Sequence, residues 1–197
     1  GRGSAIYATA ASPTDARIYR SLDDGRTFEV LSDPGVSSAY WQSFVIAPSN
    51  PKRVYLSGYH FTKQCDESSA NAGATCALNA SCTSSGGGPP PKCIAVKQFL
   101  LFRSDDGGAT WSPASQASLL VSTNSTISIA GVDPKDANQV YVHVTFETGA
   151  GGDAVYKSRT GGGTGSDDPT AWTKIFYTDD PRGLVTLVRS NGGLVAA

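Results

Sequence analysis

One short pattern recurs along the chain and constrains its fold more than any other feature. The pattern Ser-x-Asp-x-Gly-x-Thr-aromatic begins at Ser21 and again at Ser104, and a degenerate copy begins at Ser158, where Thr160 replaces the aspartate. In each copy a polar side chain can accept hydrogen bonds from nearby backbone N–H groups, and the glycine can adopt a positive φ without steric cost. Because threonine and an aromatic residue then favour extended backbone, the pattern predicts a turn between two β-strands.

The residues of the two complete copies are expected to be structural: Ser21, Asp23, Gly25, Thr27, Phe28, Ser104, Asp106, Gly108, Thr110 and Trp111. An alternative is that the adjacent carboxylates Asp105 and Asp106 bind a metal ion. A calcium loop of the EF-hand type needs oxygen ligands at alternate positions and a glutamate at its end, and neither copy has them. We therefore predict turns, with no metal and no cofactor.

The pattern resembles the Asp-box, or BNR repeat, of sialidase-like β-propellers. In that family the box is the turn between the third and fourth strands of a blade, and its role is structural. The resemblance implies an all-β propeller built of four-stranded antiparallel blades. It does not imply an activity, because enzymes, receptors and assembly factors share this architecture.

The spacing of the boxes indicates how many blades the chain contributes. Ser104 and Ser158 are 54 residues apart, and Ser21 and Ser104 are 83 apart. Removing an insertion of about 30 residues restores a period of about 50, which is a blade length. Within the partial propeller 1–197, the predicted blade segments are 1–32, 43–113 and 126–177, with another blade beginning at 183–197 and a loop insertion at 62–95.

This count predicts three to four blades of a larger ring, since propellers usually close with four to eight. The chain contains no methionine, so we expect a processed product or an excised piece. The remainder of a cleaved precursor or a second copy would complete the ring.

Four cysteines lie within the insertion: Cys65, Cys76, Cys82 and Cys93. Since no pair has the C-x2-C spacing, a zinc site is not expected. An even number in a polar loop predicts two disulfides and an oxidising location, which is secreted, periplasmic or at the cell surface. Three pairings are possible. The nested one, Cys65–Cys93 with Cys76–Cys82, is favoured because the strands that flank the loop should bring the outer cysteines together.

Charge and hydropathy exclude several classes of partner. The formal net charge is −1, and charges of both signs are interspersed. The sequence has no basic patch for nucleic acid or anionic membrane. The longest apolar run is also far short of a membrane span.

The loops that lie away from the box turns are the predicted ligand face, because that face carries the ligand site in the sialidase-like family. The candidate residues there are Tyr40, Trp41, His60, Asp66, Glu67, Glu147, Asp179, Asp180 and Arg182. Tyr40 and Trp41 are expected in a loop, where they either stack on a sugar ring or a partner side chain or fill a gap between blades. Arg20, Arg103 and Lys157 share one repeat position, which favours an architectural role.

Two functions remain open. The favoured one is an extracellular or cell-surface, non-enzymatic binding or scaffold propeller that recognises a glycan or protein through its loop-rich face, including the cysteine loop. The alternative is a glycoside hydrolase with part of its site outside this chain, which needs two carboxyls about 5–9.5 Å apart or a tyrosine nucleophile. Sialidases of this family use an arginine triad and an Arg-Ile-Pro segment. Arg17-Ile18-Tyr19 lacks the proline, no triad is evident, and no catalytic residue is assigned.

Overall fold

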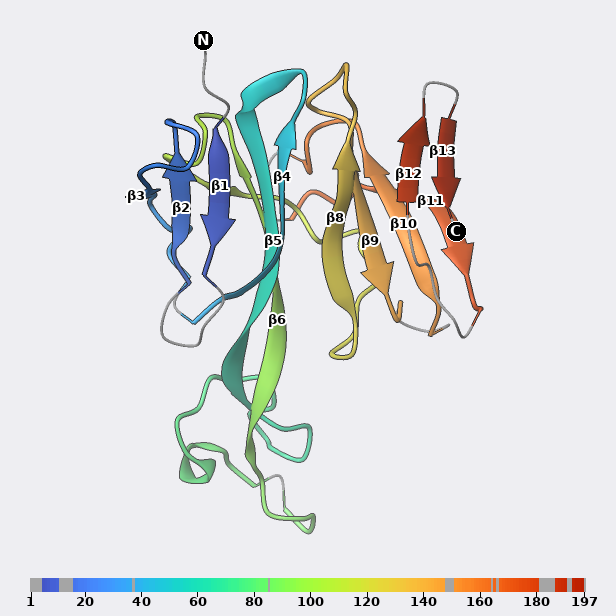
Figure 1. Ribbon diagram of the computed structural model, residues 1–197. Coiled ribbons are helices and arrows are strands. Elements are labelled where there is room, and N and C mark those ends of the chain that lie inside the picture. Colours follow the sequence, from blue (N-terminus) through green and yellow to red (C-terminus); the bar gives the residue numbers. More distant parts are fainter. Residues whose placement is uncertain are drawn as a thin grey trace.

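The computed structural model of the chain describes residues 5–10, 16–36, 38–84, 86–147, 151–163, 165 and 167–180, and the backbone of residues 187–190 and 193–196 (Figure 1). Within these residues the fold is all-β, apart from the 3-10 turn η1 (Asn79–Ser81). The strands form antiparallel sheets. Within each sheet, neighbouring strands are consecutive along the chain. The described residues form no closed barrel or closed ring of sheets.

The first sheet contains β1 (Ile6–Thr9), β2 (Ile18–Ser21) and β3 (Glu29–Val30). The second contains β4 (Tyr40–Ala47), β5 (Asn50–Cys65), β6 (Cys93–Ser104) and β7 (Ser112–Pro113). The third contains β8 (Thr126–Val132), β9 (Val140–Thr145), β10 (Asp153–Ser158) and β11 (Thr173–Thr178). The last is the hairpin of β12 (Leu187–Ser190) and β13 (Gly193–Ala196).

Apolar side chains fill the spaces between consecutive sheets. Ile18, Leu56 and Phe102 belong to the core between the first and second sheets. Tyr55 and Trp172 belong to the core between the second and third. Because both faces of the second sheet are covered, five successive residues of β5, 54–58, are all buried. This explains why the strands read as continuous apolar runs rather than as alternating ones.

The box turns are held by their own side chains. In the first box Ser21 Oγ accepts a hydrogen bond from Gly25 N at 2.8 Å, and Asp23 accepts from Thr27 N and Thr27 Oγ1 at 2.9 and 2.6 Å. The second box repeats these bonds at Ser104. Gly25 has φ +85, a conformation that is strained for any residue with a Cβ. The glycine is therefore what allows the chain to turn tightly here.

The box carboxylates make the fold sensitive to acid. Hydrogen bonds from Thr27 lower the pKa of Asp23 from 3.8 to about 2. A lowered pKa stabilises the folded state above the unfolded value, and this contribution is lost as the pH falls through the folded value. We expect the melting temperature of the wild type to fall as the pH drops from 3.8 to about 2, and Asp23→Asn to flatten that fall. Thermal denaturation across this range measures it.

The matched control is Asp24→Asn, which removes the adjacent exposed carboxylate of the same turn. This variant should follow the pH dependence of the wild type. If the curve for Asp23→Asn also runs parallel to that of the wild type, the role given to Asp23 is wrong.

Each box also binds the neighbouring sheet. Trp111 Nε1 donates to Ser32 O, just after the last strand of the preceding sheet, at 3.0 Å. After the longer turn of the third box, Trp172 packs beside Gly162 as Trp111 packs beside Gly108, and its Nε1 donates to Ser115 O at 2.8 Å. From the other side, Arg20 reaches the carbonyl of Gly107 at 3.1 Å. These contacts recur from sheet to sheet, as expected of an architectural repeat.

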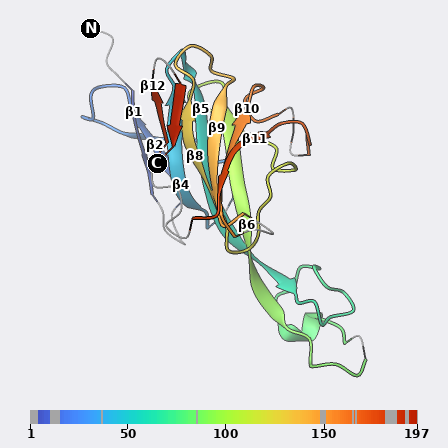
Figure 2. The same cartoon turned by 90° about the vertical axis from the view of Figure 1, so that its right-hand side faces the viewer.

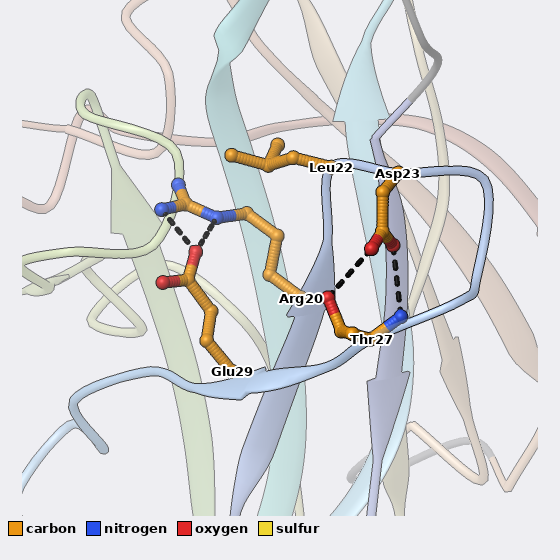
Figure 3. Close-up of a pocket in the computed structure, with 5 residues that line it drawn as sticks. All are labelled: Arg20, Leu22, Asp23, Thr27 and Glu29. Atoms are coloured by element: carbon orange, nitrogen blue, oxygen red, sulfur yellow. Dashed lines mark hydrogen bonds and ion pairs between the residues drawn. The ribbon is translucent and has the colours of Figure 1, made fainter.

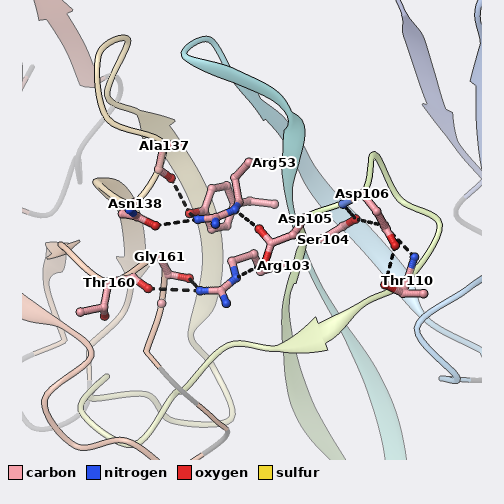
Figure 4. A network of polar contacts seen from close by, with 12 residues as sticks. Arg53, Arg103, Ser104, Asp105, Asp106, Thr110, Ala137, Asn138, Thr160 and Gly161 are labelled. Carbon is pink, nitrogen blue, oxygen red and sulfur yellow. Dashed lines mark hydrogen bonds and ion pairs between the residues drawn. The ribbon is translucent and has the colours of Figure 1, made fainter.

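Arginines of the second sheet complete this repeated junction, and Figure 4 shows them. Arg103 Nη1 donates to the carbonyls of Thr160 and Gly161 at 3.1 and 3.2 Å. Arg53 donates to Asn138 Oδ1 at 2.8 Å, and both arginines contact the carboxylate of Asp105. Asp105 thus pairs with arginines of its own sheet.

The strands β5 and β6 extend beyond their sheet as a two-stranded ribbon, which we call the arm (residues 60–98), and it projects from the body in Figures 1 and 2. The pairing continues without a break to Cys65 opposite Cys93, the juxtaposition that the sequence predicted. The disulfides, however, join Cys65 to Cys82 and Cys76 to Cys93. The predicted nested pairing is therefore wrong.

The reason is the path of the chain within the arm. After Cys65 the chain turns back and lies along the outer edge of β5, where Cys76 N donates to Lys63 O at 3.1 Å. Each cysteine of the ribbon consequently meets a cysteine from the folded-back segment. The sulfur atoms of Cys65, Cys76 and Cys82 all lie within 4.8 Å of one another.

Candidate functional site

The end of the sheets opposite the box turns carries the arm and most of the candidate residues. The pairing of Val54 with Ser104 places the start of β5 next to the second box, so the later residues of β5 approach the opposite end. The third sheet has the same orientation, because Ser158 of its box pairs with Val140 and Ala154 pairs with Val144. The root of the arm, the end of β9 and the start of β10 therefore share this end (Figure 1).

Three aromatic rings gather at the root of the arm. Tyr40 pairs with Tyr59 in the β4–β5 ladder, and their rings stack with centroids 5.1 Å apart and planes 11° from parallel. Phe61 lies two residues farther along β5, on the same face, and contacts Tyr59 edge to face at 5.7 Å. The ring of Phe61 is 54% exposed. A flat apolar surface is thus open to solvent at the root of the arm, beside Tyr40, the first residue of β4.

Lys97 adds a cation to this cluster. Its Nζ lies 4.6 Å from the centroid of Tyr59 and donates a hydrogen bond to Ser125 O at 2.7 Å. Burial lowers the pKa of Lys97. A partly desolvated ammonium on an aromatic face interacts more strongly with an anion or a carbonyl than a fully hydrated one.

These side chains border an open groove of about 360 Å³. It is lined by Tyr59, Phe61, Ala95, Lys97, Thr123 and Asn124. Its lining combines aromatic surface, one cation and exposed polar groups, which is a composition suited to recognition. The lining offers no carboxylate or thiol that could act as a nucleophile.

A second polar cluster at the same end is buried. Glu147 is 3% exposed, accepts a hydrogen bond from Tyr156 and forms an ion pair with Lys174 at 2.7 Å. Burial, followed by the hydrogen bond to Glu147, raises the pKa of Tyr156. Nearby, His143 Nε2 lies 3.0 Å from Asp153 Oδ2. Both carboxylates are therefore occupied by protein partners, and their surroundings are those of structural groups.

The structure separates the candidates of the predicted ligand face. Tyr40 lines the aromatic cluster, but Trp41 is 7% exposed and donates from Nε1 to Ala16 O at 2.6 Å. Both residues lie in β4, so the predicted loop position is wrong. Trp41 fills the space between two sheets, which was the second of the two interpretations. Glu147 is also buried and is removed from the ligand face.

The remaining candidates are dispersed. His60 is half-buried, and burial lowers its pKa. Asp66 accepts hydrogen bonds from Ser68 Oγ and Ser69 Oγ at 2.7 and 2.9 Å within a turn of the arm. Glu67 and Asp179 are exposed, Asp180 is half-buried, and Arg182 lies outside the described residues.

Tyr59, Phe61 and Lys97 were not among the residues predicted for the ligand face. A signal for them exists, because alternate residues of a strand lie on one face. Tyr59 and Phe61 are two apart on β5, and Lys97 is opposite Phe61 on β6. The insertion was predicted as a loop from residue 62 to residue 95, whereas the paired strands β5 and β6 continue into it as far as Cys65 and Cys93.

A second hollow lies beside the first box and is shown in Figure 3. It is lined by Arg20, Leu22, Asp23, Thr27 and Glu29. Arg20 and Glu29 form an ion pair across it at 2.6 Å, and Asp23 is bound to Thr27. A similar hollow borders the third box at Lys157 and Thr160. Its recurrence beside equivalent turns favours an architectural origin.

Two further features bear on compartment and ligands. Within the described ranges, the group of possible metal ligands is formed by Cys65, Cys76 and Cys82, whose sulfur atoms are in disulfides. Two disulfides fit an oxidising, extracellular compartment. The described part of the chain contains no helix that is both long and apolar enough to cross a bilayer.

Comparison of the chain with models of known protein families, and with curated proteins, finds no match.

Proposed function

We propose that the chain is a non-enzymatic recognition module, part of a larger Asp-box β-propeller of a secreted, periplasmic or cell-surface protein. Three features support the propeller. Consecutive strands are neighbours in each antiparallel sheet, the box turns repeat, and the same hydrogen bonds recur between sheets. The disulfides support the compartment. In a complete ring, further chain or a second copy supplies the missing blades.

The observation that carries the proposal is the exposed aromatic groove at the root of the arm. Phe61 presents an open ring next to Lys97, and the cross-linked arm holds both on paired strands rather than on a loose loop. Rigid aromatic residues flanked by polar groups are typical anchors of binding surfaces. The groove thus offers aromatic and cationic contacts to a ligand, and its lining contains no carboxylate.

The arrangement of carboxylates supports recognition over glycoside hydrolysis. Hydrolysis requires an accessible acid together with a second carboxyl or a tyrosine. At this end of the described structure, Glu147 and Asp153 are buried and bound to Tyr156, Lys174 and His143. Asp179 is exposed, but it is not among the residues that line the groove. Tyr156 is 2% exposed, so its hydroxyl lies out of reach of a substrate.

Replacing Phe61 is expected to weaken recognition. The disulfide-bonded protein is screened against immobilised glycans and a library of linear peptides, and the binders are compared between the wild type and Phe61→Ser. Loss of an exposed aromatic anchor should weaken binding by about tenfold or more. Phe28→Ser removes a similarly exposed ring, 47% exposed, at the first box and should leave affinity unchanged.

Turnover is assayed in parallel with fluorogenic glycosides, sialosides included, and none is expected. The proposal is wrong if the protein hydrolyses one of them. It is also wrong if every ligand found binds Phe61→Ser as tightly as it binds the wild type.

A further inference from the structure

The arm leaves a short gap in the backbone hydrogen bonding of β6. In an antiparallel ladder, pairs whose N–H and C=O groups point at each other alternate with pairs whose groups point outward. Asp66 N donates to Lys92 O at 2.9 Å, so the next pair, Cys65 with Cys93, points outward. Because the two kinds of pair alternate, the backbone N–H and C=O groups of every second residue of β6 after Cys93, namely 95, 97, 99 and 101, also point away from β5.

Protein groups cover both ends of this outward edge. Cys93 N donates to Asn79 Oδ1 at 2.8 Å. At the other end, Phe99 O accepts from Gln116 Nε2 at 3.0 Å, and Leu101 O accepts from Ala114 N at 2.8 Å. Between Cys93 and Phe99, the outward N–H and C=O groups of Ala95 and Lys97 have no hydrogen-bond partner among the described residues.

The surroundings of the gap indicate what fits it. The open groove is lined by Ala95 and Lys97 themselves, so the gap faces free space rather than packed protein. Phe61 lies across from Lys97 and supplies apolar surface. An added strand would satisfy the backbone groups and place alternate side chains against this surface.

The charge at the gap selects the kind of strand. Lys92 and residues 93–99 of β6 together contain two lysines and no acidic residue. Lys63, which is exposed, lies directly opposite Ala95 on β5. An acidic segment is therefore favoured, whereas a second copy of this strand would bring lysines together.

We propose that the arm binds a short, extended, acidic peptide segment of a partner protein, which adds as a strand to β6 at Ala95 and Lys97. This inference rests on the proposed recognition role and names its ligand. A lysine at a strand edge, such as Lys97, also discourages uncontrolled strand pairing. The gap therefore favours a strand of opposite, negative charge and disfavours neutral or basic strands.

The test begins with a phage-displayed library of random linear peptides of about ten residues, long enough to form one strand. Asn124, which lines the groove, begins the N-glycosylation sequon Asn124-Ser125-Thr126. The protein is therefore produced with its disulfides in a host that does not N-glycosylate. We expect acidic peptides with alternating apolar residues. Their synthetic versions are then measured by fluorescence anisotropy against the wild type and two variants at Ala95.

Ala95→Pro removes the outward N–H without touching the β5–β6 ladder, and proline is tolerated at strand edges. Loss of main-chain hydrogen bonding should weaken binding by about tenfold. Ala95→Val keeps the N–H and the strand and changes only the side chain, so we expect it to bind about tenfold more tightly than Ala95→Pro, and this difference measures the main-chain hydrogen bond. Disulfide mapping and thermal denaturation check that both variants fold.

A second measurement leaves the protein unchanged. In each selected peptide, single amides are N-methylated in turn. Methylation along one edge of the peptide should abolish binding, and methylation at the alternate positions should not, because only one edge of a strand faces β6.

The outcomes separate the two proposals. If binding falls in Phe61→Ser but is indifferent to Ala95→Pro and to the position of N-methylation, recognition stands and strand addition is wrong. If the selection yields no peptide but a glycan binds in a way that depends on Phe61, recognition again stands and strand addition is again wrong. If no ligand depends on Phe61, both fail.

Discussion

Trp172→Ala is expected to lower the free energy of unfolding by about 3–5 kcal/mol, the usual cost of deleting a large buried aromatic side chain. Trp172 is 6% exposed and belongs to the core between the second and third sheets. Its indole also donates to Ser115 O at 2.8 Å, so the truncation leaves a buried carbonyl without that partner. Urea denaturation followed by circular dichroism measures the loss.

Two controls separate packing from hydrogen bonding. Trp172→Phe keeps most of the volume and removes the donor, and should cost about 1–2 kcal/mol. Trp111→Ala deletes the equivalent box tryptophan, which is only half-buried, and should cost less than Trp172→Ala. A loss below about 1 kcal/mol for Trp172→Ala, less than one buried hydrogen bond and its packing, would mean that this residue does not join the two sheets.

Gly58→Ala is the second substitution with a large expected effect. A Cβ at this position would lie 2.4 Å from the carbonyl oxygen of Tyr40 and 2.8 Å from Cε3 of Trp41. Because backbone must move to relieve the first contact, we expect a destabilisation of about 2–3 kcal/mol. The movement displaces Tyr40 from its stack on Tyr59, so the aromatic groove should be disturbed as well.

The matched control is Gly131→Ala. Gly131 also lies in a strand, β8, but a Cβ there would meet no heavy atom within 4 Å. Its effect should stay within about 0.5 kcal/mol, as for most substitutions free of steric conflict. Equal destabilisation by the two alanines would show that the close approach of β4 to β5 is not what requires glycine at position 58.

The sequence predicted the local turns well, because the interactions that form them are local. Ser104, Asp106 and Thr110 make their hydrogen bonds within one turn, and their spacing contains the necessary information. The all-β class follows for the same reason. How the sheets pack against one another depends on surfaces far apart in the chain, and a recurring turn constrains these only indirectly.

The cysteine pairing and the site depended on contacts that spacing does not encode. The register of the arm was anticipated, but the segment that folds back along β5 was not, and it decided which sulfur atoms meet. Trp41 and Glu147 have side chains suited to ligand contact, yet tertiary packing buried both. A phenylalanine in a strand usually enters a core, but β4 begins only at Tyr40, opposite Tyr59, so it does not pair with β5 at Phe61.

The continuity of β5 from the second box to the disulfides has a mechanical consequence. A tension applied at the tip of the arm runs along the axis of β5 and β6 and reaches the body as shear across the β4–β5 ladder. Hydrogen bonds loaded in shear share the force and must break together, whereas bonds loaded from one end open in succession. A partner that pulls on the arm therefore pulls on the whole second sheet, and the two disulfides keep the load from being dissipated by unravelling of the tip.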